Sequence, residues 1–181
     1  MNALKKVLVG LGVVFAILIF IGLALPSALD VQRSITINAP PSTIFPYIND
    51  LKAFNRWSPW AEMDPNTQYT FAGPASGVGA KMIWSSKNPG VGGGTQQITA
   101  SESNRRVEVV LDFGEQGQGR SYYDLKSEGL NTVITWGFNT DFGYDLVGRY
   151  FALMMDDMVA EEYEKGLANL KALVEGQGKT E

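Results

Sequence analysis

The stretch LVGRYFALMMDDMVAEEYEKGLANLKALV, residues 146–174, contains no proline and is rich in residues that favour helices. Its apolar side chains recur every three or four positions, as on one face of an amphipathic helix. This stripe consists of Ala152, Met155, Val159, Tyr163, Leu167, Leu170 and Val174, and Phe151, Met154 and Met158 are expected to widen it in the first half. We therefore expect one long helix that must bury its apolar face against another layer.

The residues before this helix predict that layer, because short apolar segments and turn residues alternate there. Strand candidates follow one another at intervals of about 8–12 residues, which is typical of an antiparallel meander. They are residues 31–37, 67–73, 79–86, 95–103, 105–114, 119–129 and 131–140. Alternation along the later strands makes one side of the sheet apolar and the other polar. The sequence thus predicts an α+β protein in which about six or seven strands pack on the long helix.

The segment FNRWSPWAEMDPN, residues 54–66, is too apolar for an ordinary surface loop. Pro40 and Pro41 upstream suit a helix start, so we expect one or two short helices before it. Trp57 and Trp60 either fill the core between these helices and the sheet or form the rim of a pocket. We prefer the core, since buried aromatic side chains usually fill space.

The N-terminus contains the run VLVGLGVVFAILIFIGLAL, residues 7–25, without a charged or polar side chain. A helix rising about 1.5 Å per residue would carry it roughly across the hydrocarbon core of a membrane. Lys5 and Lys6 precede it, which predicts a cytoplasmic N-terminus and a domain outside the cell membrane. A cleaved signal peptide is the alternative, but the run exceeds the usual apolar core of about 7–15 residues. We expect a cytoplasmic N-terminus over residues 1–6, a single-pass transmembrane helix over 7–25, a linker over 26–30, a folded domain over 31–175 and a flexible tail over 176–181.

Composition excludes several kinds of chemistry. The 181 residues include no histidine and no cysteine, which excludes thiol nucleophiles, serine–histidine triads, disulfides and most zinc sites. Without Lys5 and Lys6, 13 basic residues face 19 acidic ones, a net charge of −6, so neither nucleic acid nor anionic headgroups are expected partners. We expect no cofactor and no metal, because the paired acids of residues 156–157 and 161–162 diverge on a helix.

The order of strand, short helices, long meander and final long helix is that of the helix-grip fold. The residues ITINAPPSTIFPYINDLKAFNRWSPW (35–60), MDPNTQYTFAGPASGVGAKMIW (63–84) and EKGLANLKALVE (164–175) resemble the SRPBCC superfamily, which includes START-like lipid-transfer domains and polyketide cyclase/dehydrase-like proteins. The resemblance runs from about residue 31 to residue 175. It implies a curved sheet wrapped around the helix, an elongated apolar cavity between them and a hydrophobic ligand. The motifs are structural, so the resemblance implies no catalytic residues.

Aromatic and methionine side chains are the candidates for the lining of such a cavity. They are Trp57, Trp60, Trp84, Phe113, Tyr122, Trp136, Phe138, Met154, Met155 and Met158. The preferred function is membrane-anchored binding of a hydrophobic small molecule or lipid. The alternatives are a cyclase/dehydratase-like enzyme and an interaction module without a ligand.

Three observations would separate these functions. A carboxylate or tyrosine deep in the cavity with a shifted pKa would favour the enzyme. A lining of carbon alone would favour binding, and no cavity above about 300 Å³ would favour the module. Arg120 and Tyr122 alternate together, so both could reach inward and polarise a carbonyl group. NPGVGGG, residues 88–94, lacks the ending of a phosphate-binding loop and is expected to be a hairpin loop that gates the cavity.

Overall fold

A computed structural model of the chain describes residues 3–177. The expected tail therefore lies outside the described residues from 178 onward, and so do residues 1 and 2 of the expected cytoplasmic segment. The α-helices are α1 (Ala3–Ala24), α2 (Pro41–Asn49), α3 (Leu51–Phe54), α4 (Pro59–Met63) and α5 (Leu146–Gln177), and one 3-10 helix, η1, covers Gly114–Gln116. The strands are β1 (Ala28–Ile37), β2 (Gln68–Ala72), β3 (Lys81–Ser85), β4 (Gly93–Glu102), β5 (Arg106–Asp112), β6 (Gln118–Glu128) and β7 (Asn131–Asp141).

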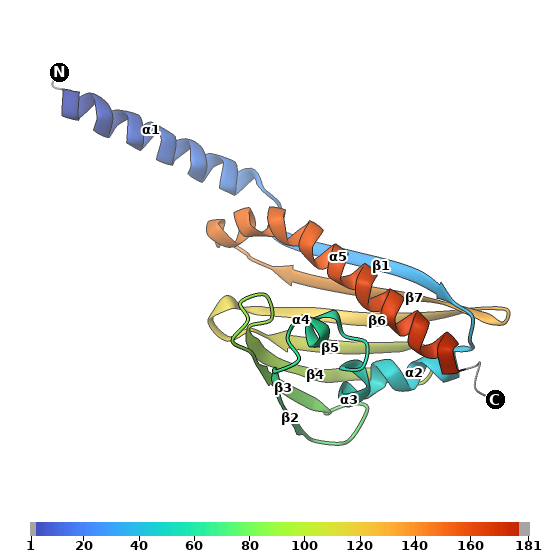
Figure 1. Cartoon of the computed structure of the whole chain (residues 1–181). Coiled ribbons are helices and arrows are strands. Elements are labelled where there is room, and N and C mark those ends of the chain that lie inside the picture. Colours follow the sequence, from blue (N-terminus) through green and yellow to red (C-terminus); the bar gives the residue numbers. More distant parts are fainter. Residues whose placement is uncertain (1–2, 178–181) are drawn as a thin grey trace.

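The seven strands form one antiparallel sheet in the order β1-β7-β6-β5-β4-β3-β2, and α5 lies across it (Figure 1). Strands β2 to β7 are a meander, and its last strand, β7, pairs with the N-terminal strand β1 to complete the sheet. Helices α2 to α4 connect β1 with β2 and close the layer beside α5. The predicted α+β helix-grip fold, with an additional apolar N-terminal helix, is confirmed.

The expected linker over residues 26–30 is shorter in the structure. Ala28 already pairs with Asp141, so residues 28–30 belong to β1. Leu29 explains the early start, because it is buried in phase with Val31 and alternates with exposed neighbours. Few residues therefore separate α1 from the sheet.

Helix α5 buries the predicted stripe. Tyr163, Leu167, Leu170 and Val174 are in the core, while Met155 and Val159 are partly buried against it. Three residues expected to widen this face do not do so, because Phe151, Met154 and Met158 are exposed. They lie on a neighbouring side of the helix that turns away from the sheet, and no described residue covers them.

The register brings one set of strand ends together. Ala28 pairs with Asp141, Asp112 pairs with Gln118, and Ser85 pairs with Gly93. Since neighbouring strands are antiparallel, the starts of β1, β4 and β6 and the ends of β3, β5 and β7 lie at one end of the sheet. Helix α1 leaves from this end and α5 begins there (Figure 1). We call it the α1 end.

A buried arginine joins α1 to α5. The Arg149 guanidinium donates hydrogen bonds to the carbonyl oxygens of Gly22 at 3.3 Å, Leu23 at 3.2 Å and Leu25 at 3.1 Å. The last carbonyls of a helix have no partner within the helix and carry partial negative charge, so a cation there is favourable. The Tyr150 hydroxyl donates to the Leu18 carbonyl oxygen at 2.6 Å. The contact therefore fixes the end of α1 to the first turn of α5.

Candidate ligand cavity

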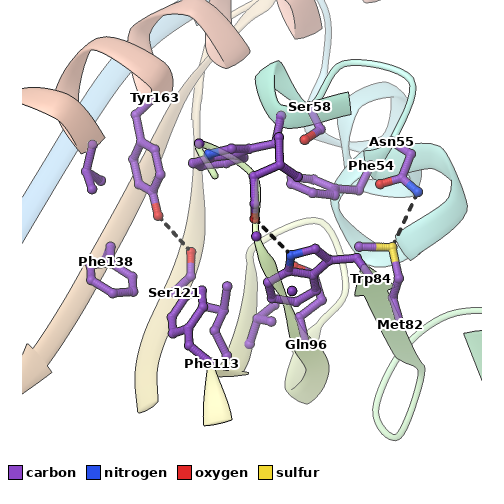
Figure 2. Close-up of a pocket in the computed structure, with 18 of the residues that line it drawn as sticks. Phe54, Asn55, Ser58, Met82, Trp84, Gln96, Phe113, Ser121, Phe138 and Tyr163 are labelled. Atoms are coloured by element: carbon purple, nitrogen blue, oxygen red, sulfur yellow. Dashed lines mark hydrogen bonds between the residues drawn. The ribbon is translucent and has the colours of Figure 1, made fainter. Parts of the chain in front are cut away.

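A cavity of about 290 Å³ lies between the sheet, α5 and the α3–α4 segment (Figure 2). Its lining is mainly apolar and comes from β2 to β7, from residues 54–60, from the β3–β4 loop and from one side of α5. The volume lies just below the range typical of small-molecule sites, about 300–1,000 Å³, and only slightly under the limit of about 300 Å³ that would favour an interaction module. The volume alone therefore does not separate a binding site from an interaction module.

Stacked aromatic rings form one wall of the cavity. Trp136 of β7 lies against Tyr163 of α5 with ring centroids 3.8 Å apart and an angle of 13° between the planes. Trp60 meets both rings edge-on, at 5.9 and 6.2 Å. The Trp136 indole donates a hydrogen bond to the Ser121 hydroxyl oxygen at 2.9 Å, and that hydroxyl donates to the Gly137 carbonyl at 2.9 Å. The wall thus contains polar groups, but the Trp136 indole and the Ser121 hydroxyl already have hydrogen-bond partners within the protein.

The opposite side of the cavity has polar groups without a protein partner. The side-chain oxygen of Asn55 is buried and accepts no hydrogen bond from any described residue, while its amide nitrogen lies 3.3 Å from the Met82 sulfur. Gln96 stands directly across from Met82 in the sheet and is only 7% exposed. Within residues 3–177, the side chains of Gln96 and Ser58 also make no hydrogen bond. Because buried polar groups are normally paired, these three offer hydrogen bonds to a ligand.

No charged side chain is among the described residues that line the cavity. Burial raises the pKa of Tyr123 and Tyr163 well above the usual range, so both phenols keep their protons at neutral pH. Buried tyrosines with shifted pKa values are the feature that would favour an enzyme, but the shift here is upward, away from neutral pH, whereas a catalytic acid or base works best with a pKa near it. An ion would enter without a counter-charge, which is unfavourable in an apolar environment. The cavity is thus suited to uncharged molecules.

The β3–β4 loop closes part of the cavity, and residues 89–93 contribute to the lining. The Trp84 indole donates a hydrogen bond to the Val91 carbonyl at 3.2 Å, and the Ser86 hydroxyl donates to the Asp64 carboxylate. The bond from Ser86 is the main reason why the pKa of Asp64 lies below its ordinary value. The expected hairpin loop is present at this position, while its action as a gate stays a prediction.

Six of the ten side chains proposed from sequence line the cavity. They are Trp60, Trp84, Phe113, Trp136, Phe138 and Met155. The other four lie elsewhere. Met154 and Met158 are on the exposed side of α5, Trp57 is in the core, and Tyr122 is on the outer face of the sheet.

Trp57 is a core residue behind the cavity wall. It is 1% exposed, its indole donates to the Tyr47 carbonyl oxygen at 3.0 Å, and its ring meets Trp136 edge-on at 5.1 Å. Trp60, three residues further along, is the second residue of a separate short helix, α4, and is partly buried at the cavity. The two tryptophans therefore have different positions, one in the core and one in the cavity wall.

Tyr122 and Arg120 lie on the outer face of the sheet. The Tyr122 hydroxyl donates to Gln32 at 3.0 Å, and the Arg106 guanidinium lies 4.7 Å from the centre of its ring. Arg120 is exposed. The register gives the reason, because Tyr122 pairs with outward Glu108 whereas Ser121 and Tyr123 face inward with their own partners. The expected inward Tyr–Arg pair is absent from the cavity.

Sequence reasoning missed the polar residues of the cavity. Asn55, Gln96 and Ser121 carry no sequence pattern that separates them from other polar residues of a loop or strand. Tyr163 does have a signal, because it belongs to the apolar stripe of α5, but the stripe indicates packing and does not show which of its members lines a cavity. The phase of Leu125, which is inward together with Tyr123, is the signal that places Tyr122 outward.

The fold and the cavity define a helix-grip domain of the SRPBCC type. Residues 28–175 match the sequence model of the family described as "Polyketide cyclase / dehydrase and lipid transport". The chain belongs to this family, and the resemblance to the SRPBCC superfamily is confirmed.

Solved structures share the fold at low sequence identity. Protein Ms6760 from Mycobacterium smegmatis is 16% identical, with a TM-score of 0.59 over 82% of this chain and 92% of that one. Protein SA2116 from Staphylococcus aureus, of unknown function, is 8% identical, with a TM-score of 0.64 over 84% of this chain and 97% of that one. The Aha1 dimer from Colwellia psychrerythraea is 16% identical, with a TM-score of 0.55 over 81% and 96%. Among curated proteins, no sequence matches this chain.

Proposed function

We propose that this protein is a membrane-anchored SRPBCC domain that binds an uncharged hydrophobic small molecule or lipid in the cavity under α5. The observation that carries this proposal is the chemistry of the lining. It is mostly apolar, it contains no charged side chain among the described residues, and it presents the unpaired oxygen of Asn55 beside the Ser58 hydroxyl and the Gln96 amide. An apolar site with a few convergent polar groups is typical of small-molecule binding. The family description, which names lipid transport, supports the same class of ligand.

The unpaired groups favour a ligand that is apolar over most of its surface and has a carbonyl, hydroxyl or amide group. Asn55 offers an acceptor, while Gln96 and Ser58 each offer both a donor and an acceptor. A ligand group that pairs with the buried Asn55 oxygen would relieve the cost of leaving that atom unsatisfied, about 1–3 kcal/mol. A carboxylate or phosphate would instead lose its hydration without gaining a cation.

Helix α1 supports the membrane anchor. Among the described residues it is the one helix long and apolar enough to cross a membrane, and Gly22 is its only buried residue. Removal of α1 as a signal peptide would leave the buried Arg149 guanidinium without two of its acceptors, the carbonyl oxygens of Gly22 and Leu23. This favours retention of the helix. With Lys5 and Lys6 at its start, the proposed topology is a single pass with the N-terminus in the cytoplasm and the domain outside.

Photoaffinity labelling of the full chain in phosphatidylcholine nanodiscs tests the proposal. The probes are a diazirine fatty alcohol and the fatty acid with the same chain, at about pH 8, where the acid is ionised. We expect the alcohol to label cavity residues such as Trp136 and Val109 and the acid to label them weakly. Both probes should label α1, which serves as the internal control for delivery to the bilayer.

A matched pair of variants makes the test specific for the cavity. Leu111→Trp places a large side chain at a lining position, and Leu130→Trp makes the same change at an exposed turn. The first variant should lose cavity labelling and keep labelling of α1, while the second should behave as wild type. Labelling of α1 without labelling of the cavity in the wild-type chain would refute ligand binding and favour the interaction module.

A cyclase/dehydratase-like enzyme is the second candidate. The family description names both activities. The Tyr163 hydroxyl oxygen lies 3.5 Å from the Ser121 hydroxyl oxygen in the cavity, where the Tyr163 hydroxyl could donate to a carbonyl oxygen of a substrate. Turnover of an aromatic polyketide precursor that falls strongly in Tyr163→Phe, with unchanged binding, would favour this candidate. Binding without turnover favours the first proposal.

A further inference from the structure

An apolar surface lies beside α1 and has no partner in the described chain. Val147 is 79% exposed, Phe151, Met154 and Met158 are also exposed, and Tyr144, just before α5, is 91% exposed. The spacing of three or four residues places Val147, Phe151, Met154 and Met158 on one exposed side of α5, away from the buried stripe. Tyr144 precedes Val147 by three residues, just before the helix begins. We call Tyr144, Val147, Phe151, Met154 and Met158 the outer face of α5. Contiguous exposed apolar surface of this kind marks a contact site.

The outer face begins where the proposed anchor ends. The hydroxyl of Tyr150 bonds to the backbone of Leu18, and a side-chain atom at Gly22 would meet the Tyr150 ring at 3.1 Å. Arg149 holds the last carbonyls of α1 from the same turn of α5. The first turns of α5 are therefore fixed against the last two turns of α1, which is the boundary between lipid and water if α1 spans the bilayer.

The opening of the cavity lies at the same end of the domain. The lining residues that are exposed are Pro89, Gly90, Gly93 and Gln116, so the cavity meets solvent there. They belong to the connections from β3 to β4 and from β5 to β6, both of which are at the α1 end of the sheet. Figure 1 shows these connections on the side of the sheet from which α1 extends. The opposite end has the β6–β7 turn with Leu130.

We propose that the α1 end of the domain rests on the bilayer, with the outer face of α5 in the lipid interface and the cavity opening turned toward the same leaflet. This inference rests on the proposed membrane anchor and adds the orientation of the domain and the source of its ligand. A ligand would pass from the leaflet into the cavity without crossing bulk water. The contact is apolar rather than electrostatic, because exposed Asp145, Asp156 and Asp157 flank the outer face.

Depth-dependent fluorescence quenching of the full chain tests this orientation. The chain has no cysteine, so single cysteines at chosen sites carry one environment-sensitive NBD label each. The variants are Val147→Cys on the outer face, Lys87→Cys beside the cavity opening, Leu130→Cys at the opposite end and Phe15→Cys within α1. Each is placed in phosphatidylcholine nanodiscs with or without a nitroxide-labelled lipid. Leu130 is the matched control, because it is also apolar and is 89% exposed.

The proposal expects nitroxide lipid to quench the labels at residues 147 and 15 strongly, the label at residue 87 to a smaller extent, and the label at residue 130 not at all. Quenching at residue 15 with equal, weak signals at residues 147 and 130 would overturn the orientation while the anchor stands. An unquenched label at residue 15 would overturn the anchor and the orientation together. A label at residue 147 that is shielded from aqueous iodide but not quenched by lipid would indicate a protein partner and also overturn the proposal.

Discussion

Trp57 and Trp60 show at the scale of single residues how the local backbone separates two similar side chains. Trp57 ends a turn that points its ring into the core, whereas Pro59 starts α4 and directs Trp60 to the cavity wall. Both tryptophans could be proposed from sequence, but different roles could not be assigned to them. The reason is that a spacing of three residues does not fix the direction of side chains outside a regular helix. Burial and cavity lining now assign them different roles.

This difference gives a prediction for stability and binding. Trp57→Ala should lower the free energy of unfolding by about 3–5 kcal/mol, as for other buried tryptophans. Trp60→Ala removes a partly exposed ring and should cost less, while it weakens labelling of the cavity by the fatty alcohol probe. Thermal unfolding followed by near-UV circular dichroism, together with the labelling yield, measures both effects. Equal losses of stability in the two variants would contradict the assignment.

The hydrogen bond between Ser86 and the Asp64 carboxylate gives a prediction for the response of the β3–β4 loop to pH. Its pKa in the folded chain lies below the ordinary value of 3.8 because Ser86 donates a hydrogen bond to the carboxylate. A lowered pKa contributes stability above the unfolded-state value, and that contribution is lost as the pH falls through the folded-state value. Asp64→Asn and Ser86→Ala should therefore both flatten the fall in melting temperature below about pH 4. Variants that keep the wild-type slope would show that this bond does not hold the loop.

At the scale of elements, α5 has two apolar faces and the sequence predicted only one layer against it. The periodicity of its buried stripe was sufficient to predict a long helix packed on a sheet. The same periodicity could not show that Phe151, Met154 and Met158 turn away, because a helical wheel gives the width of an apolar face and not the width of its partner. The strands were predictable for a similar reason, since alternation fixes which residues share a face.

The junction between α1 and α5 gives a prediction at this scale. Arg149→Met keeps much of the side-chain volume but removes the hydrogen bonds to the carbonyl groups at the end of α1. Bonds to a charged group contribute about 1.5–3 kcal/mol, so the melting temperature should fall by several degrees. Limited proteolysis should also cut faster at residues 25–27, where the junction opens.

Arg105→Met is the control for this variant. Arg105 forms an exposed ion pair with Glu102, and such surface pairs contribute about 0–1 kcal/mol. The control should melt and resist protease nearly as wild type does. Indistinguishable behaviour of Arg149→Met and Arg105→Met would mean that α1 is not fixed to the domain.

At the scale of the whole molecule, the sequence predicted the fold more fully than the site. Apolar periodicity, turn spacing and family resemblance all concern the packing of elements, and packing determines a helix-grip fold. The cavity depends on where packing is incomplete, which requires the three-dimensional positions of Asn55, Met82 and Gln96 on separate elements. No pattern along the chain encodes that juxtaposition.

Native mass spectrometry of the full chain, released from gently extracted membranes, addresses the proposed ligand without a chosen probe. We predict that the wild-type chain retains a small uncharged hydrophobic molecule and that Leu130→Trp retains the same mass. Leu111→Trp, which fills the cavity, should be found without it. A wild-type chain at its bare mass, or a bound molecule that Leu111→Trp keeps, would contradict ligand binding in the cavity under α5.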